Sequence, residues 1–353
     1  ATDKVALGTL QSSTGATLIA NAAKTSATDV TLQTGATSGS TVALSNSLDA
    51  ASATTNTATQ QVTLDSTTLL STGTTSAAAD TVDANDVDAA GAVVLGSLQT
   101  TTKTSTTATA GGLNNAGTPV IDATTFALTV TGATTSSALN LTGNTQNANA
   151  TGSTATNAIG LSGTTVGVGI AIASQQDSDA DSAVTAATNA STGLTATTLG
   201  TGSTATVSGN LIQAKALSAN TDNSMSVAAT SVTLPNSDTT AIKAAVLTAA
   251  SGTVTGAFAT INDQSVLNDT SATVDAETAS LVNLSTTGAV TGGSALVNET
   301  NTLTARAQGA VTTNTTNLTI GGTLGRGTTT TTDIANGAVI ANLQSIAAGA
   351  DVN

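Results

Sequence analysis

The sequence predicts an all-β protein, and two observations favour a β-solenoid (a β-helix) with short, irregular coils. The first is composition: Trp, Tyr, Cys and His are absent from the 353 residues, and only Phe126 and Phe258 are aromatic. Aromatic side chains normally fill thick cores, so we expect a thin interior of Val, Ile, Leu, Ala and Thr methyl groups. The second is the abundance of Thr, whose branched Cβ suits a half-buried strand.

The apolar residues occur in short runs, in which apolar and small polar residues alternate. This period of two is typical of a strand with one buried face. Gly, Asn, Asp and Ser interrupt the runs and predict frequent turns. In chain order, the expected strands lie at 30–32, 41–44, 61–64, 126–130, 166–172, 231–234 and 317–320.

Helical periodicity is scarce. The Ala-rich segment 240–250 predicts one short helix, and 334–348 is a weaker candidate. No run of 18 apolar residues occurs, so a transmembrane helix is not expected. Composition does not change between the two halves and no linker stands out, which predicts a single continuous β-repeat array over 1–353.

A loose internal repeat supports this array. An apolar residue, then Thr or Ser, then Gly recurs along the chain, and the segment 141–161 resembles 207–227, with 254–274 a more distant match. Such repeats are typical of units that stack on their neighbours. Tandem β-sandwich domains are the alternative fold, although their cores, about 10 Å thick, usually require aromatic residues.

The two ends of the chain suggest assembly. The chain begins at Ala1 without an initiator Met, so we expect a mature chain whose leader has been removed. The expected strands begin at Val5, and the segment 334–353 is charged only at Asp351. Soluble solenoids carry polar or charged caps, and neither end resembles one. The sequence therefore predicts that copies of the chain join head to tail by strand pairing and grow a filament.

Charge excludes some partners. Seven Lys and Arg stand against 21 Asp and Glu, which gives a net charge of −14. An acidic surface repels phosphate, so we expect neither nucleic-acid binding nor attraction to anionic membranes, and no membrane insertion. Divalent cations are the natural counterions.

Two acidic clusters are candidate Ca²⁺ sites. Asp177, Asp179 and Asp181 are two residues apart, and in a loop their oxygens would converge on a cation. The helix-loop-helix signature is not met, because Ser182 and Thr188 stand where Gly and Glu are required. The alternative is a solvated acidic turn. The second cluster is Asp80, Asp83, Asp86 and Asp88 with Asn85, and a weaker third pair is Asp275 and Glu277.

Catalysis is not expected. The absence of His and Cys excludes Ser-His-Asp and Cys-His constellations. Paired carboxylates hydrolyse glycosides in other proteins, but such sites also hold sugar with aromatic and basic residues, which are few and scattered here. We therefore expect that the protein is not an enzyme.

The order Leu/Val-Ser/Thr-Gly-Asn, followed by alternating Ala, Asn and Thr, occurs at 141–161 and 207–227. In this rhythm the chain resembles bacterial extracellular β-repeat fibre and adhesin proteins, and above all holdfast-anchoring proteins. The resemblance covers about 140–345 and is one of composition and rhythm. It implies secretion to the cell surface, self-assembly, and adhesion to surfaces or polysaccharide.

These observations together predict an extracellular structural subunit that assembles into a β-rich filament for adhesion or biofilm scaffolding. Three alternatives remain open: a surface-layer or phage-fibre component, an ice-binding or glycan-binding β-solenoid, and a polysaccharide-processing β-helix. No cofactor is expected apart from Ca²⁺.

Overall fold

The structure of the protein is a computed structural model that describes residues 5–22, 30–70, 87–89, 93–110, 124–167, 169–234, 242–246, 252–256, 258–275, 281–326, 338–346 and 352. Every regular element within these ranges is a β-strand, so the predicted all-β class is confirmed. In the same residues, no helix is long and apolar enough to cross a bilayer.

Both predicted helices are wrong where the structure describes them. Within 240–250 lies strand β18 (Ile242–Val246), and within 334–348 lies strand β25 (Ala338–Ile346). β18 pairs with β19 (Gly252–Gly256) and β8 (Val87–Ala89) in a small antiparallel sheet. β25 pairs in parallel with another strand along its whole length. Strand pairing therefore overrides the helical propensity of Ala in both segments.

The other strands form five stacks, in which all pairs are parallel. Sheet A contains β1 (Val5–Thr14), β9 (Val93–Thr102), β14 (Ile170–Ser178), β20 (Phe258–Val266) and β25. Sheet B contains β2 (Thr17–Asn21), β10 (Ser105–Ala110), the first half of β15 (Ala183–Leu199) and β21 (Asp269–Asp275). Sheet C contains β3 (Val30–Thr34), β4 (Thr37–Ser38), β11 (Thr124–Thr135), the second half of β15 and β22 (Val282–Thr286).

The last two stacks complete each circuit of the chain. Sheet D contains β5 (Thr41–Ser45), β12 (Ala138–Thr142), β16 (Thr204–Ser208) and β23 (Ala295–Glu299). Sheet E contains β6 (Leu48–Asp65) with β7 (Thr68–Leu70), β13 (Thr145–Gly167), β17 (Leu211–Leu234) and β24 (Thr302–Arg326). The chain visits sheets A to E in this order in four successive passes, and β25 begins a fifth.

Each pass is long, so the prediction of short coils is wrong. Partner residues in successive passes are 97, 66 and 91 positions apart at the turn into sheet E. They are 88, 77, 88 and 80 apart in sheet A. The length comes from the strands of sheet E, of which β24 alone has 25 residues. The irregularity of the repeat, which the sequence predicts, reflects the different lengths of the connections.

The predicted equivalence of 141–161 and 207–227 is confirmed. Leu141 pairs with Val207, and Leu161 pairs with Val227, on neighbouring strands of sheets D and E. The more distant match, 254–274, is not equivalent to them. It falls on β19, β20 and β21, and its place beside 211–234 is taken by β24.

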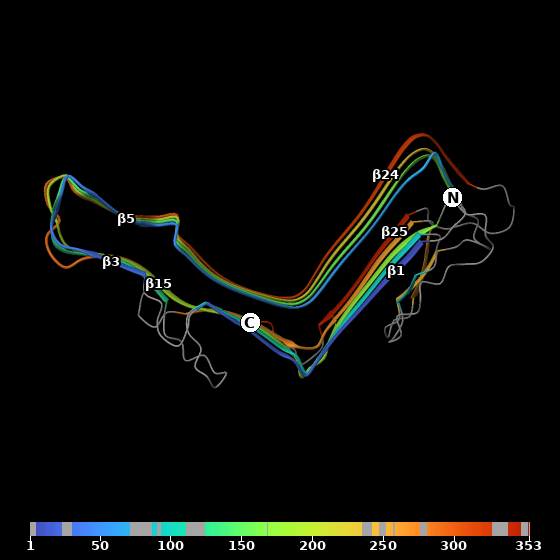
Figure 1. Ribbon diagram of the computed structural model, residues 1–353, viewed down its shortest axis with the longest axis horizontal. Helices are drawn as coiled ribbons and strands as arrows, with labels where there is room; N and C mark the ends of the chain where they lie inside the picture. The colour runs from blue at the N-terminus through green and yellow to red at the C-terminus, as the bar shows by residue number, and fades with distance from the viewer. Residues whose placement is uncertain are drawn as a thin grey trace.

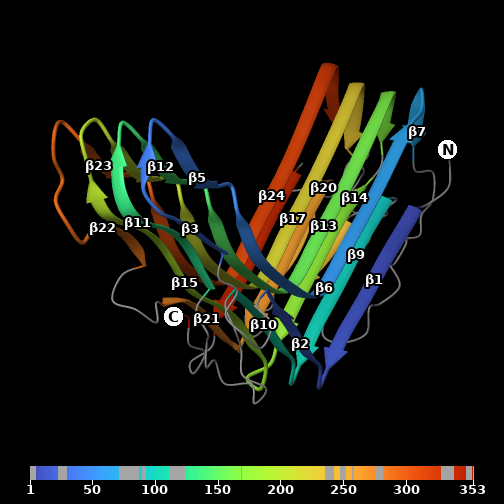
Figure 2. The same cartoon turned by 60° about the vertical axis from the view of Figure 1, so that its left-hand side comes forward.

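The stacks form two layers that are bent together into a V, as the view along the stacking direction shows (Figure 1). Sheets A, B and C form one layer, and sheets D and E form the other. Turned by 60°, the strands of each stack appear side by side (Figure 2).

The space between the layers is thin, as the scarcity of aromatic residues predicts. Where sheet A faces sheet E, the buried cluster includes Leu95, Ile172, Ile159, Val227 and Phe258. Where sheet B faces sheet E, the cluster is almost entirely Ala, together with Val184. Where sheet C faces sheet D, the cluster consists mainly of Leu and Val. Because the same positions recur in every pass, each apolar side chain packs on its counterparts above and below.

Candidate functional site

A ladder of glutamine side chains runs through the interior of sheet A. Its members are paired in register on the five strands and are Gln11, Gln99, Gln176, Gln264 and Gln344. From Gln99 onward, each Nε2 donates to the Oε1 of the glutamine one pass earlier, at 2.7 Å in every case. The sequence analysis missed this ladder, because its members are about 80 residues apart and Gln is common on exposed strands.

The second N–H of each amide crosses the interior to the opposite layer. Gln99, Gln176 and Gln264 donate to the backbone carbonyls of Thr154, Asn220 and Val311 in sheet E, at 2.9, 2.9 and 3.1 Å. The three glutamines are almost completely buried. A primary amide has two donors and one acceptor oxygen, so the ladder satisfies polar groups that would otherwise be costly to bury.

The ladder has a direction, and its two ends are therefore different. Gln11 donates to the Thr57 carbonyl at 2.6 Å, and within the described residues its second N–H has no acceptor. Gln344 donates to Gln264 and Thr312, and no described residue donates to its Oε1. One end of the stack thus presents a free amide donor, and the other end presents a free amide acceptor.

Two further ladders at the turns run in the opposite sense. The backbone N–H of Ser137 donates to Ser203 Oγ at 3.2 Å, and that of Ser203 to Ser294 Oγ at 3.3 Å. At the turn into sheet E, the N–H of Asn144 donates to Asn210 Oδ1, and that of Asn210 to Asn301 Oδ1, each at 3.0 Å. In the described part of the last pass, the N–H groups of Ser294 and Asn301 have no equivalent acceptor. These ladders are directional as well.

Exposed apolar side chains concentrate on the two outer edges of the stack. We call β1, β2, β3, β5 and β6 the first-pass edge, and β21 to β25 with the turns between them and Val352 the last-pass edge. Leu7 is 40% exposed and Leu10 60%, whereas Leu95 and Leu98, their partners one pass inward, are 0% and 3% exposed. Every exposed large apolar side chain in the described residues except Leu267 lies on one of these edges. They are Leu7, Leu10, Ile19, Leu48, Val290, Leu296, Leu303, Leu318, Ile340, Ile346 and Val352.

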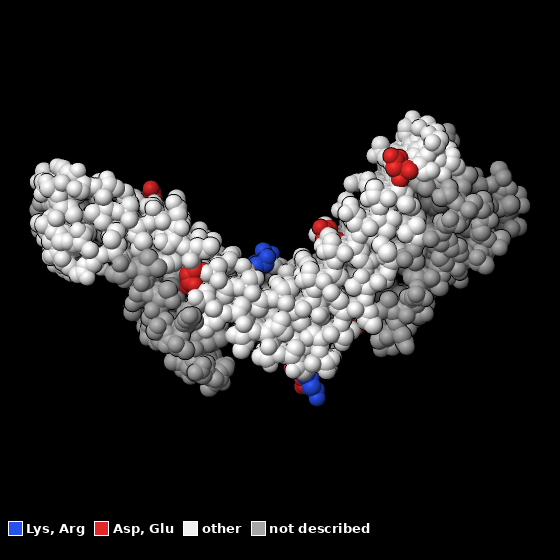
Figure 3. Space-filling model, viewed as in Figure 1, with Lys and Arg blue, Asp and Glu red and all other residues white. Residues whose placement is uncertain are grey.

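The outer strands of sheet A also lack the usual protection of an edge. Natural edge strands are blunted by Lys, Pro or inward-pointing charges. Neither β1 nor β25 contains a charged residue or a proline. Charged side chains are sparse on the broad face of the molecule as well (Figure 3). The two outer strands of sheet A are therefore open to pairing with another strand.

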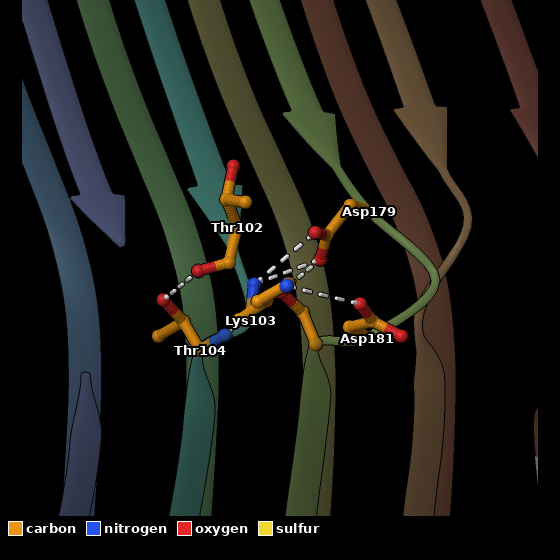
Figure 4. Close-up of polar contacts among 6 residues, drawn as sticks. Thr102, Lys103, Thr104, Asp179 and Asp181 are labelled. Atoms are coloured by element: carbon orange, nitrogen blue, oxygen red, sulfur yellow. Dashed lines mark hydrogen bonds and ion pairs between the residues drawn. The ribbon is translucent and has the colours of Figure 1, made fainter. Parts of the chain in front are cut away.

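The predicted Ca²⁺ ligands at 177–181 are separated by the fold. Asp177 lies on β14, where its carboxylate accepts a hydrogen bond from Gln175 Nε2 at 2.8 Å. Asp179 and Asp181 lie in the turn that follows. Asp179 accepts from the backbone N–H of Lys103 at 3.0 and 3.2 Å, and Asp181 lies 3.9 Å from Lys103 Nζ (Figure 4).

The described contacts of this turn centre on Lys103. Lys103 has a φ of 50°, and the Asp179 carboxylate that binds its N–H also accepts from Ser182 Oγ at 2.6 Å. No group of three acidic residues within the described ranges is arranged to hold a metal ion. Of the other candidates, Asp80, Asp83, Asn85, Asp86 and Glu277 lie outside the described residues, as do the side chains of Asp88 and Asp275. Calcium binding stays a prediction.

The structure brings forward one acidic residue that the sequence analysis missed. Asp263 on β20 is 1% exposed, and neither of its carboxylate oxygens has a hydrogen-bond partner in the described part of the chain. Burial, and secondly the charge of Asp177, raise the pKa of Asp263 to about 6. The pKa of Asp177 is also raised by burial, against the hydrogen bond from Gln175. Only the register reveals Asp263 as unusual, because it stacks on Gln175 and Leu343.

Comparison of the chain with protein-family models, with curated proteins and with solved structures gave no match. The function is therefore inferred from the geometry of the two edges.

Proposed function

We propose that the protein is an extracellular structural subunit that adds head to tail, first-pass edge to last-pass edge, and so builds a β-rich filament. The observation that carries this proposal is the complementarity of the two ends of the glutamine ladder. The Gln11 end offers an amide donor, and at the other end Gln264 Oε1 is an acceptor in the same column, where Gln344 of the same chain donates. A second copy whose Gln11 took this position would continue the ladder without a break.

A β-solenoid, as one continuous array over 1–353, is the fold that we propose for this subunit. In its support, the chain visits five stacks in a constant order, and the stacks are parallel and in register. Parallel stacks extend along one axis by adding strands. The turn ladders support the same axis, because the free N–H of Ser294 would find Ser40 Oγ of a second copy, the group equivalent to Ser137 Oγ.

The apolar edges supply the driving force for this association. Burial of apolar surface contributes about 25 cal/mol per Å², and the leucine and isoleucine side chains of both edges are exposed in the single chain. The partners of Leu7, Leu10 and Leu303 one pass inward, which are Leu95, Leu98 and Ile212, are almost completely buried. A second copy is the partner whose spacing of apolar and amide groups matches each edge.

The role in adhesion or biofilm scaffolding and the location at the cell surface follow from the resemblance to extracellular fibre proteins. Ice binding is less well supported, because Lys215, Asp222 and Arg306 interrupt the Thr and Ser residues of sheet E and a regular Thr face is lacking. A surface-layer protein would use the same edges but form a flat lattice.

Electron microscopy of the purified chain, with light scattering, tests the proposal. We expect unbranched filaments with an axial repeat of about 19 Å, because four passes stack at about 4.8 Å each. The variant Leu7→Lys places a charge on the first-pass edge, in a column that holds Leu95, Ile172 and Thr260, and should abolish filaments. Ser226→Lys is the matched control, since Ser226 is exposed on a central strand. Monomeric particles at high concentration, with and without Ca²⁺, would exclude the filament, and a lattice would favour the surface-layer alternative.

A further inference from the structure

The stacks contain unequal numbers of strands, and this inequality has a consequence for assembly. Among the described residues, sheet A contains a strand from each of five passes, whereas sheets D and E contain strands from only four. The additional strand is β25, which pairs with β20 over Phe258–Val266. β25 therefore lies in a fifth pass that has no counterpart in sheets D and E.

β25 occupies the same register as β1. Tracing the register through β9, β14 and β20 aligns Val5 with Ala338 and Gln11 with Gln344. The same alignment places Ile340 at the position of Leu7, Leu343 at that of Leu10, and Ser345 at that of Ser12. In register, and in the residues at these positions, β25 thus resembles the strand with which a second copy would begin.

The two strands cannot occupy one position. If β5 and β6 of an incoming copy pair with β23 and β24, its β1 falls on the edge of β20, where β25 already lies. We propose that the edge of β20 is the binding site for β1 of a second copy, and that β25 is an intramolecular occupant displaced during assembly. This inference rests on the proposed function, because it requires first-pass edge to last-pass edge addition.

β1 could replace the polar contacts of β25, but not the apolar contact of Ile346, because Ser13 lies at that position. Gln344 donates to Gln264 Oε1 at 2.7 Å. After exchange, Gln11 of the second copy would donate to the same oxygen. Asn342 accepts from Asn314 on β24, and Ile346 covers Gly309. Ile340 and Ile346 nevertheless remain 49% and 52% exposed.

The free energy of strand pairing favours the exchange of β25 for β1 when a whole second copy is added. Displacement of β25 breaks the pairing of nine residues, and β1 restores pairing of the same kind. The incoming copy also pairs with β23 and with the 25-residue strand β24, which have open edges in the single chain. Displacement must precede or accompany this gain, so β25 slows nucleation and suppresses premature assembly.

A reversible cross-link tests the displacement in the full chain. Ser265 and Ser345 are paired in register on β20 and β25, so their Cα atoms lie about 4.8 Å apart, within the range of a disulfide. The protein has no cysteine of its own. The double variant Ser265→Cys/Ser345→Cys would lock β25 when oxidised and release it when reduced, and titration of free thiols would verify the cross-link.

Two readouts separate this inference from the proposed function. The first is fluorescence anisotropy with a labelled peptide of residues 5–14, against a scrambled peptide, and the second is filament growth by light scattering. We expect the oxidised variant to bind the peptide at least tenfold more weakly than the reduced variant and to form no filaments. The single variant Ser345→Cys is the control for the oxidant.

Each outcome has one meaning. Equal peptide binding and equal growth in both redox states would overturn the displacement of β25 and leave the filament intact. Peptide binding that depends on reduction, without filaments in any condition, would support the β20 site and refute the proposed function. Deletion of residues 338–353 provides a second test, because it should shorten the lag of assembly and strengthen peptide binding; an unchanged lag and affinity would contradict the inference.

Discussion

At the scale of single residues, the structure departs from its own repeating pattern in few places, and these departures are the most testable. Asp263 is a buried carboxylate without a hydrogen-bond partner in the described residues, in a column that holds Leu98, Gln175 and Leu343 in other passes. Ser136 has a φ of 48° where the equivalent residues one pass away, Gly39 and Gly202, are glycines. The buried carboxylate of Asp263 and the left-handed backbone of Ser136 each cost free energy that the equivalent residues in other passes do not.

Asp263→Asn should stabilise the protein at neutral pH. The folded pKa of Asp263 is about 6, above the ordinary value of 3.8, so the folded state binds this proton more tightly than the unfolded state. The contribution of Asp263 to stability is therefore greatest at acidic pH and falls as pH rises from about 4 to about 6, by roughly 3 kcal/mol for two pKa units. Thermal unfolding between pH 4 and 8 measures this, and the asparagine variant should lose this decline. Asp222→Asn, at an exposed carboxylate, is the control; an equal effect there would refute the assignment.

Ser136→Gly should raise the free energy of unfolding by about 1 kcal/mol. A left-handed backbone costs a residue with a Cβ about 1–2 kcal/mol, from which the additional unfolded-state entropy of glycine is subtracted. The reciprocal change, Gly202→Ala, should destabilise, because Gly202 has a φ of 69°. Gly96→Ala is the control, since a Cβ at Gly96 would meet no atom within 4 Å and its φ is not positive. Urea unfolding would show the difference, and equal effects of the two alanine variants would contradict it.

At the scale of elements, the glutamine ladder links every strand of sheet A to the next and to sheet E. Gln176 at its centre donates to Gln99 and to the Asn220 carbonyl, and it accepts from Gln264 and Thr221. Such chains of buried amides are worth more than isolated hydrogen bonds when they are complete. They are costly when one member is removed, because its partners remain buried.

Gln176→Leu should therefore destabilise the chain by about 3–5 kcal/mol, since it leaves several buried donors and acceptors unpaired at about 1–3 kcal/mol each. Gln11→Leu, at the end of the ladder, should cost less, because Gln11 exchanges hydrogen bonds with fewer groups. The same Gln11 variant should nevertheless slow filament growth, since it removes the free donor. Urea unfolding of both variants tests the gradient, and a greater loss of stability at Gln11 would refute it.

At the scale of the whole molecule, parallel pairing between residues 66 to 97 positions apart predicts slow folding. Loop closure must precede contacts of this separation, and proteins dominated by them fold in milliseconds to seconds. We expect refolding from urea to be slow. We also expect the variant Leu7→Lys, which blocks assembly, to refold in higher yield than the wild type, because exposed edges pair wrongly during folding. Stopped-flow circular dichroism and recovered monomer measure both; equal yields would show that the edges are inert.

The positions of strands could be predicted from the sequence, whereas the sheets in which they pair could not. The alternating runs at 41–44, 126–130 and 317–320 lie on β5, β11 and β24, as expected. The run at 166–172 instead spans a corner, because Gly167 ends β13 of sheet E and Ile170 begins β14 of sheet A. Alternation reports only that one face is buried, and it continues across a corner when the core lies on the same side of both strands.

The sequence by itself determined that the chain is all-β with a thin interior, because the lack of aromatic residues and the alternation of small apolar and polar residues permit little else. It also determined that 141–161 and 207–227 are equivalent, since both carry the same turn and strand pattern. Only the tertiary structure decided the length of each pass, the stacking of five glutamines and the register that β25 shares with β1. These depend on register between strands distant in sequence, and register is set by the packing of all passes together rather than by any local pattern.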